Sequence, residues 1–175
     1  PSILRLFMLQ IQNVKRYSAK NIISLGEAAT LASKLKESGN TVGLCHGCFD
    51  ILHPGHVKHL ESAKRLCDFL FVSITSDKFV TLAKGSKRPI FSDRLRAYML
   101  ANLKVVDYVM VSDYLLGVET IQQIKPSLYI KGPGYMNKII PSLTAEILMT
   151  EKNGGRVVYT EDPIMSTTEI IDYLK

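Results

Sequence analysis

The sequence predicts an α/β protein with a doubly wound, Rossmann-like open parallel sheet of about five strands. Short apolar runs and amphipathic segments alternate along the chain, as they do where a crossover helix follows each parallel strand. One of these runs, Phe69 to Ile74, is almost entirely apolar, which is typical of a strand buried on both faces. A third observation is that the run 42–44 leads through a Gly-containing turn into a helical pattern, an arrangement that aims backbone N–H groups at an anion.

The individual elements follow from local signals. A helix is expected to begin at Ser24, because Glu27 stands at the capping-box spacing, and to end at Gly39-Asn40. Residues 76–91 are expected to be a loop, because they contain a glycine, a proline and four basic residues. Strands are predicted over 41–44, 69–74, 105–111, 127–130 and 156–159, and further helices over 53–67, 92–102, 117–125, 141–152 and 167–174.

Length and charge restrict the class of protein. A chain of 175 residues is expected to form one domain, here assigned to residues 20–175 and preceded by an N-terminal arm, residues 1–19. The net charge is +6 and the isoelectric point about 9.2, but the basic residues are scattered singly. This distribution favours a small phosphate-bearing ligand over nucleic acid.

Three cysteines without a secretory signature favour the reducing cytoplasm. No apolar run approaches the length of a membrane span, so no membrane association is expected. Residues 2–11 are apolar but short and interrupted by Arg5. We expect this segment to pack or to contact a second copy in a homodimer, and a signal-peptide remnant is the alternative.

All four histidines lie within residues 42–59. His53 and His56 flank Pro54-Gly55 where a helix should begin, next to N–H groups that have no intrahelical partner. This spacing predicts that both imidazoles contact phosphate in phosphoryl or nucleotidyl transfer. His59 is expected to lie on a solvated helix face, and the role of His46 stays open.

The cysteines next to these histidines allow two other interpretations. Cys45 and Cys48 followed by His53 and His56 resemble a zinc ligand set. However, the two cysteines straddle the end of a buried strand, so no metal site is predicted. A thioredoxin-type motif should open a helix directly, whereas residues 49–52 intervene here. Cys67 is expected to be a core residue.

The run Gly47 to His56 resembles the signature of the cytidylyltransferase-like (HxGH) nucleotidyltransferases, which have the HUP-type fold. Further motifs stand in the order seen in heptose-1-phosphate adenylyltransferases and, more distantly, in glycerol-3-phosphate cytidylyltransferases. These motifs are residues 20–25, 75–77, 82–85 with 88–89, 93–94, 106–107, 130–132, 154–155 and 166–171. The resemblance covers residues 20–175.

The resemblance implies transfer of a nucleoside monophosphate from ATP or CTP, as a Mg²⁺ complex, to a sugar phosphate such as a heptose 1-phosphate. It implies catalytic roles for His53, His56, Lys84 and Arg94, with Lys84 closing over the phosphates. The implied nucleotide contacts are Gly47, Cys48, Phe49, His53, His56, Lys131, Gly132, Ser166, Thr167 and Thr168. The implied substrate contacts are Asp50, Asp77 and Tyr135.

The sequence also departs from the family pattern. His46 replaces the family's Asn or Gly, Thr75 begins what is usually Asn-Ser-Asp, and the family's Lys-Gly-Gly-Asp-Tyr is Lys-Gly-Pro-Gly-Tyr at 131–135. The last change removes a charged acceptor near the implied base and substrate pocket. Two alternatives therefore stay open: a CTP-dependent enzyme for glycerol 3-phosphate or another alditol phosphate, and a nucleotide-binding module without turnover.

Overall fold

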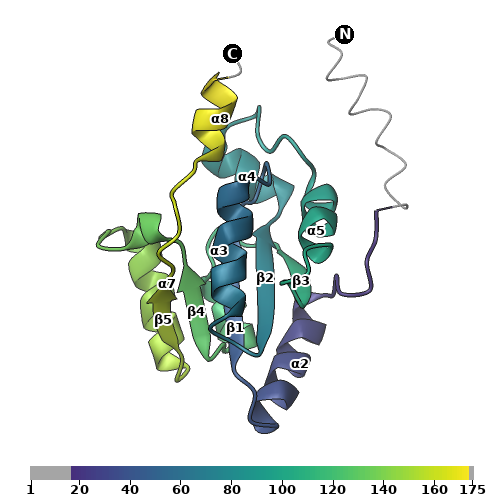
Figure 1. Cartoon of the computed structure of the whole chain (residues 1–175), viewed down its shortest axis with the longest axis vertical. Coiled ribbons are helices and arrows are strands. Elements are labelled where there is room, and N and C mark those ends of the chain that lie inside the picture. Colours follow the sequence, from purple (N-terminus) through teal and green to yellow (C-terminus); the bar gives the residue numbers. More distant parts are fainter. Residues whose placement is uncertain (1–16, 174–175) are drawn as a thin grey trace.

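Strand β1 (Val42–Gly47) is the centre of the fold in the computed structural model, which describes residues 17–173 (Figure 1). It pairs in parallel with β2 (Phe69–Thr75) on one side and with β4 (Leu128–Lys131) on the other. Strands β3 (Tyr108–Ser112) and β5 (Arg156–Tyr159) form the edges, so the order is β3-β2-β1-β4-β5 and all neighbours are parallel. The predicted arm segment, residues 2–11, lies outside the described residues.

Helices cover both faces of this sheet, which confirms the predicted doubly wound α/β class. Helices α3 (Pro54–Lys64) and α5 (Asp93–Ala101) pack on one face through side chains such as Leu60 and Leu100. Helices α2 (Leu25–Glu37), α6 (Val118–Ile124) and α7 (Pro141–Lys152) lie over the other face, where Ile121 belongs to a second core cluster. The short helices α4 (Asp77–Lys84) and α8 (Thr167–Tyr173) both lie towards the upper end of the molecule in Figure 1.

The capping signal at the start of α2 acts as expected. The Ser24 hydroxyl accepts a hydrogen bond from the Glu27 backbone N–H at 3.2 Å, and the Glu27 carboxylate accepts from the Ser24 backbone N–H at 2.8 Å. Such reciprocal bonds satisfy two N–H groups that a bare helix end leaves without partners. The predicted bounds of α7 and β5 match the structure, and β1 runs three residues beyond its predicted end.

The prediction that 76–91 is a loop is wrong for its first half, because α4 occupies Asp77–Lys84. Ser76 has the extended backbone of an N-cap residue and Val80 is buried in the core, so the segment has both a start signal and an apolar anchor. The prediction gave more weight to the four basic residues of this segment than to its short amphipathic pattern. The irregular stretch begins only at Gly85, where the helix ends.

The strand order creates a switch point between β1 and β4. The chain leaves β1 towards β2 and β3 on one side, and β4 and β5 extend the sheet on the other. Connections therefore diverge at the carboxyl ends of β1 and β4 and leave a crevice there. The residues that follow these strands, 48–53 and 132–135, flank this crevice.

Candidate active site

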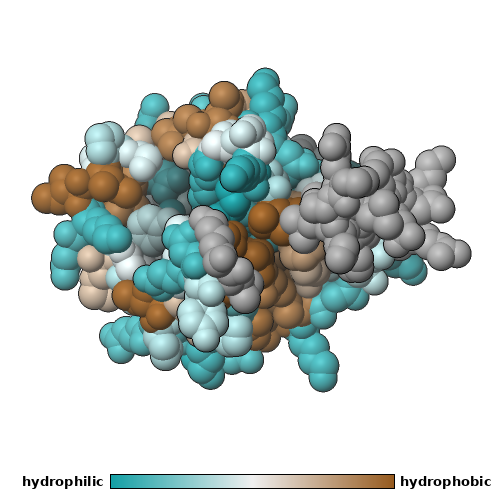
Figure 2. All heavy atoms as spheres, turned by 90° about the horizontal axis from the view of Figure 1, so that it is seen from above, coloured by the Kyte–Doolittle hydropathy of each residue, from teal (hydrophilic) through white to brown (hydrophobic). Residues whose placement is uncertain are grey.

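A pocket of about 330 Å³ lies at this switch point. Its lining comes from three segments and one lysine: residues from 46 at the end of β1 to 59 in α3, residues 130–135 around the end of β4, residues 163–168 before and within α8, and Lys84. The surface seen from above in Figure 2 mixes hydrophilic and hydrophobic residues. Two exposed apolar residues, Ile164 and Met165, belong to the pocket lining. The pocket thus joins parts of the chain that are more than 100 residues apart.

His53 is the N-cap of α3 and is buried, with 6% of its surface exposed. Its Nδ1 accepts a hydrogen bond from the backbone N–H of His56 at 3.3 Å. Because Nδ1 is the acceptor, the neutral ring carries its proton on Nε2. That Nε2 is buried and has no partner among residues 17–173. His53 therefore offers a free N–H donor in the pocket.

The ring of His56 stacks on that of His53, with ring centroids 3.7 Å apart and the planes inclined by 18°. Its Nδ1 is also buried without a partner in the described residues. Burial lowers the pKa of His56 to about 4, and repulsion by His53 and His59 adds to this effect. Burial also lowers the pKa of His53. Both rings are therefore neutral near pH 7, and a neutral imidazole can donate one hydrogen bond without carrying a full charge.

The loop before α8 closes over the start of α3 because Gly55 has no side chain. A Cβ at Gly55 would lie 2.9 Å from the Cβ of Met165 and 3.2 Å from two atoms of the His53 ring. The hydroxyl of Thr167 also donates to the Ile51 carbonyl at 3.4 Å. These contacts bring Ser166, Thr167 and Thr168 to the pocket, where the Ser166 hydroxyl accepts from the Thr168 backbone N–H at 3.2 Å.

Two other histidines line the pocket, and the prediction of a solvated face for His59 is wrong. His59 is partly buried, its Nδ1 lies 2.9 Å from the Thr160 hydroxyl and its Nε2 lies 3.5 Å from the Cys45 sulfur. These contacts join α3 to the end of β5. His46 is held by the Ser73 hydroxyl, 3.1 Å from its Nδ1. Burial lowers the pKa of His46 to about 4.

The lowered pKa of His46 predicts that the stability of the fold depends on pH. The unfolded chain protonates His46 near pH 6.5, whereas the folded chain holds it neutral down to about pH 4. Between these values the unfolded state binds more protons, so acidification reduces the free energy of unfolding. Between pH 6.5 and 4, we expect the free energy of unfolding to fall by about 2–3 kcal/mol less in the variant His46→Gln than in the parent protein. Urea unfolding across the interval measures the difference, and parallel pH curves for the two proteins would contradict the prediction.

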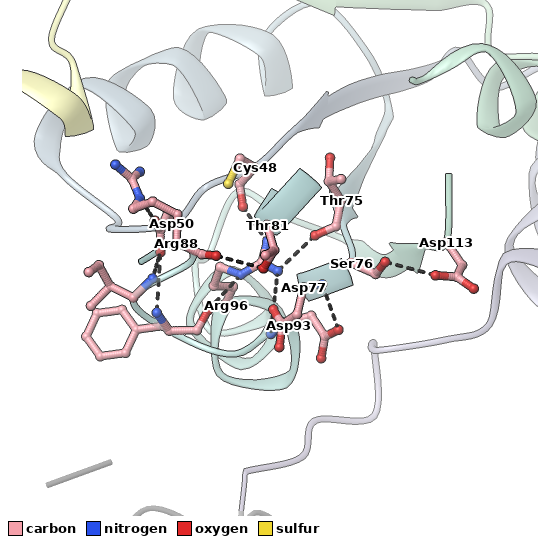
Figure 3. Close-up of polar contacts among 12 residues, drawn as sticks. Cys48, Asp50, Thr75, Ser76, Asp77, Thr81, Arg88, Asp93, Arg96 and Asp113 are labelled. Carbon is pink, nitrogen blue, oxygen red and sulfur yellow. Dashed lines mark hydrogen bonds and ion pairs between the residues drawn. The ribbon is translucent and has the colours of Figure 1, made fainter. Parts of the chain in front are cut away.

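The predicted substrate residue Asp50 lines the pocket, but its carboxylate is fully engaged. It accepts hydrogen bonds from the Arg88 Nε and from the backbone N–H groups of Ile90 and Phe91, the latter at 2.6 and 3.3 Å (Figure 3). Asp50 is 1% exposed. It therefore anchors the loop after α4 to the turn after β1, and Arg88, a residue that the sequence analysis did not assign to the site, is its partner.

The predicted substrate residue Asp77 does not line the pocket. Its carboxylate accepts from the Asp93 backbone N–H at 2.7 Å and from the buried Arg96 Nη2 at 2.8 Å (Figure 3). Arg96 also donates to the carbonyls of Cys48, Thr75 and Phe91. Sequence reasoning missed Arg96, although it stands on the same helical stripe as the apolar Ala97 and Leu100. Asp77 is thus part of the scaffold beneath the pocket.

Arg94, predicted to be catalytic, also lies away from the pocket. It is exposed, and its Nε donates to the Tyr17 carbonyl at 3.3 Å. The structure brings all the other predicted residues together in the pocket lining: Gly47, Cys48, Phe49, Asp50, His53, His56, Lys84, Lys131, Gly132, Tyr135, Ser166, Thr167 and Thr168. Lys84 is near enough to Cys48 and His56 to lower the pKa of both side chains, although burial raises the pKa of Cys48 on balance.

The three cysteines are free thiols. Cys45 is buried in the core on the α3 side of the sheet, and burial raises its pKa well above the usual range. Among residues 17–173, no group of three or more His, Cys, Asp or Glu side chains is arranged to hold a metal ion. In the same range, no helix is both long and apolar enough to cross a membrane.

Comparison with known proteins identifies the family. Residues 44–172 match the family model described as cytidylyltransferase-like. The bifunctional protein HldE of Helicobacter pylori strain P12 is 47% identical over 130 residues, which are 74% of this chain and 27% of that protein. HldE of Rhodopseudomonas palustris strain BisA53 is 37% identical over 153 residues, 87% of this chain and 30% of that protein. The chain therefore spans less than a third of the length of these curated relatives.

Two solved structures have a fold similar to that of this chain. The lipopolysaccharide core biosynthesis protein from Thermoplasma volcanium GSS1 superimposes with a TM-score of 0.59 and 28% identity, covering 72% of this chain and all of that one. Pantoate-beta-alanine ligase from Francisella tularensis, solved with a nucleotide, shares the fold at a TM-score of 0.53 and 12% identity, over 86% of this chain and 76% of that one. Together with the histidine pair at the switch point, these matches show that the chain belongs to the cytidylyltransferase-like family and is a nucleotidyltransferase.

Proposed function

We propose that residues 20–175 form a catalytic domain that transfers a nucleoside monophosphate from ATP or CTP to a sugar phosphate and releases pyrophosphate. The observation that carries this proposal is the stacked pair His53–His56 at the start of α3. Each ring has a buried nitrogen without a partner in residues 17–173. A buried polar group without a partner is costly, and a phosphate oxygen would satisfy it.

The proposed mechanism is positioning and charge stabilisation. Both imidazoles, Lys84 and Gly55 at the N-terminus of α3 line the same pocket, so negative charge that develops on the phosphates would meet preorganised polar groups and the positive end of the helix dipole. The acceptor phosphate is mostly dianionic at neutral pH, since its second pKa is about 6. It can therefore attack in line without a general base.

A magnesium ion would enter this pocket as part of the nucleotide complex. Among residues 17–173, Asp50 is the one carboxylate in the pocket lining, and both of its oxygens already accept hydrogen bonds. Mg²⁺ commonly keeps several waters and binds through substrate phosphates. When bound, it would neutralise charge on the phosphates, and the residues here would hold the complex through His53, His56 and Lys84.

The relatives support a heptose 1-phosphate acceptor. Two similarities favour this branch: the HldE proteins, matched over a quarter to a third of their length, and the lipopolysaccharide core biosynthesis protein from Thermoplasma volcanium. The Pro133-Gly134 departure from the family pattern weakens the case for ATP, which keeps the CTP and alditol phosphate alternative open, and Gly134 is the one feature that favours a binding module without turnover. A homodimer and a cytoplasmic location are further predictions, tested by sedimentation velocity and cell fractionation.

A matrix of nucleotides against acceptors tests the proposal. Pyrophosphate release is measured for ATP and CTP with heptose 1-phosphate and glycerol 3-phosphate, with the double variant His53→Ala/His56→Ala as the blank. We expect the highest rate for ATP with heptose 1-phosphate. A maximum for CTP with glycerol 3-phosphate would favour the alternative enzyme. Nucleotide binding without pyrophosphate release in any combination would identify a binding module and overturn the proposal.

A further inference from the structure

A buried ion pair lies behind one side of the pocket. The Lys131 Nζ lies 3.0 Å from the Glu146 Oε2, and the two side chains are 6% and 7% exposed. The other carboxylate oxygen, Oε1, accepts from the Gly117 backbone N–H at 3.0 Å. Glu146 does not line the pocket, but its partner Lys131 does. Both oxygens of this carboxylate are therefore committed to holding β4, α6 and α7 together.

Lys131, which Glu146 holds in place, also contacts the aromatic ring of Tyr135 in the pocket. Its ammonium donates to the Tyr129 hydroxyl at 3.2 Å and lies 4.3 Å from the centroid of the Tyr135 ring. Tyr135 is 42% exposed and lines the pocket, so few other contacts fix its ring. A cation over an aromatic face is attracted by the ring quadrupole, more strongly where water is excluded. The position of Tyr135 therefore depends on where Glu146 holds Lys131.

The pair also sets the charge of this side of the pocket. Lys131 paired with Glu146 is neutral overall, and the neighbouring lining consists of Ile130, Pro133, Tyr135, glycine backbone and two histidines, His46 and His59. Burial lowers the pKa of both histidines, which keeps their rings uncharged near pH 7. A Cβ at Gly134 would meet no atom within 4 Å, so the backbone there is open to a ligand. A flat, uncharged ring with polar edges suits such a surface, whereas a phosphate suits the side with His53.

We propose that Glu146 is a positioning residue that fixes Lys131 and Tyr135 as the nucleobase side of the pocket and keeps that side neutral. This inference rests on the proposed function, because it requires a nucleoside triphosphate whose phosphates occupy the histidine side. Glu146 would then decide how much tighter a nucleotide binds than its bare phosphate chain. A purely structural ion pair would not affect that ratio.

The test compares three ligands on the full chain by titration calorimetry: ATP, CTP and inorganic tripolyphosphate. In Glu146→Gln we expect ATP affinity to fall at least about tenfold, the size of effect that follows the loss of a hydrogen bond to a charged group. Tripolyphosphate should bind as before or more tightly, because Lys131 loses its counter-ion. The control is Glu151→Gln, an exposed carboxylate on the same helix, which should leave all three affinities unchanged.

Tyr135→Ala covers the case in which Glu146→Gln does not fold, because Tyr135 is an exposed residue outside the buried core. It should reproduce the selective loss of nucleotide affinity. Equal weakening of nucleotide and tripolyphosphate would overturn the inference and leave a structural pair. A change confined to the KM of the sugar phosphate would also overturn it, because the Tyr135 side would then hold the acceptor. If the parent protein binds ATP selectively but releases no pyrophosphate, the proposed function fails while the nucleobase assignment stands.

Discussion

Replacing His53 by Asn or His56 by Ala should lower kcat by about 10²–10³, the usual cost of losing one donor that stabilises transition-state charge. Asn is chosen at position 53 because the His53 Nδ1 caps α3, and an Asn side chain can accept the same N–H bond. The variant then loses the free Nε2 donor but keeps the cap. Steady-state pyrophosphate release gives kcat, and thermal unfolding shows whether the fold is unchanged.

Lys58→Ala is the matched control, since Lys58 lies on the same helix, is exposed and pairs only with Glu61 in a surface ion pair. Such pairs contribute little to stability, so both activity and melting temperature should match the parent. Turnover close to the parent value in both histidine variants would remove the histidine pair from the mechanism. If activity falls only in proportion to the amount of folded protein, the histidine pair likewise has no direct role in the mechanism.

Arg96→Ala should have the largest effect on stability, about 3–5 kcal/mol. The side chain is fully buried, and its guanidinium donates to three carbonyls and to Asp77. Removing it takes this donor from the buried Thr75 carbonyl and from the partly buried carbonyls of Cys48 and Phe91, and it opens a cavity beneath the turn at Cys48. Urea unfolding at neutral pH measures the change. A smaller loss is expected for Lys in place of Arg, which keeps the charge but not the planar fork.

Arg94→Ala is the control for this prediction. Arg94 lies two positions earlier on α5, is exposed and makes one hydrogen bond to a backbone carbonyl. A surface substitution of this kind should change the free energy of unfolding by no more than about 0.5 kcal/mol. Equal effects of the two substitutions would show that the buried network does not carry the stability assigned to it here.

The sequence alone determined the α/β class and most element positions, because caps and hydrophobic periodicity act within a few residues. It also located the phosphate-binding stretch, since His53, Gly55 and His56 lie within one helical turn. The stacking of the two imidazoles and the contact of Gly55 with Met165 belong to the assembled structure. Met165 is far away along the chain, so no local pattern could have paired it with Gly55.

Tertiary structure alone decided which charged residues serve the site and which support it. Arg94 and Arg96 differ by two positions, about 200° around a helix, so packing of α5 on the sheet buries one and exposes the other. Packing likewise places Glu146 next to Lys131. A buried charge is stable only where groups of opposite charge or hydrogen-bonding groups from distant segments contact it. The order of the strands in the sheet decides which segments are close enough to make these contacts.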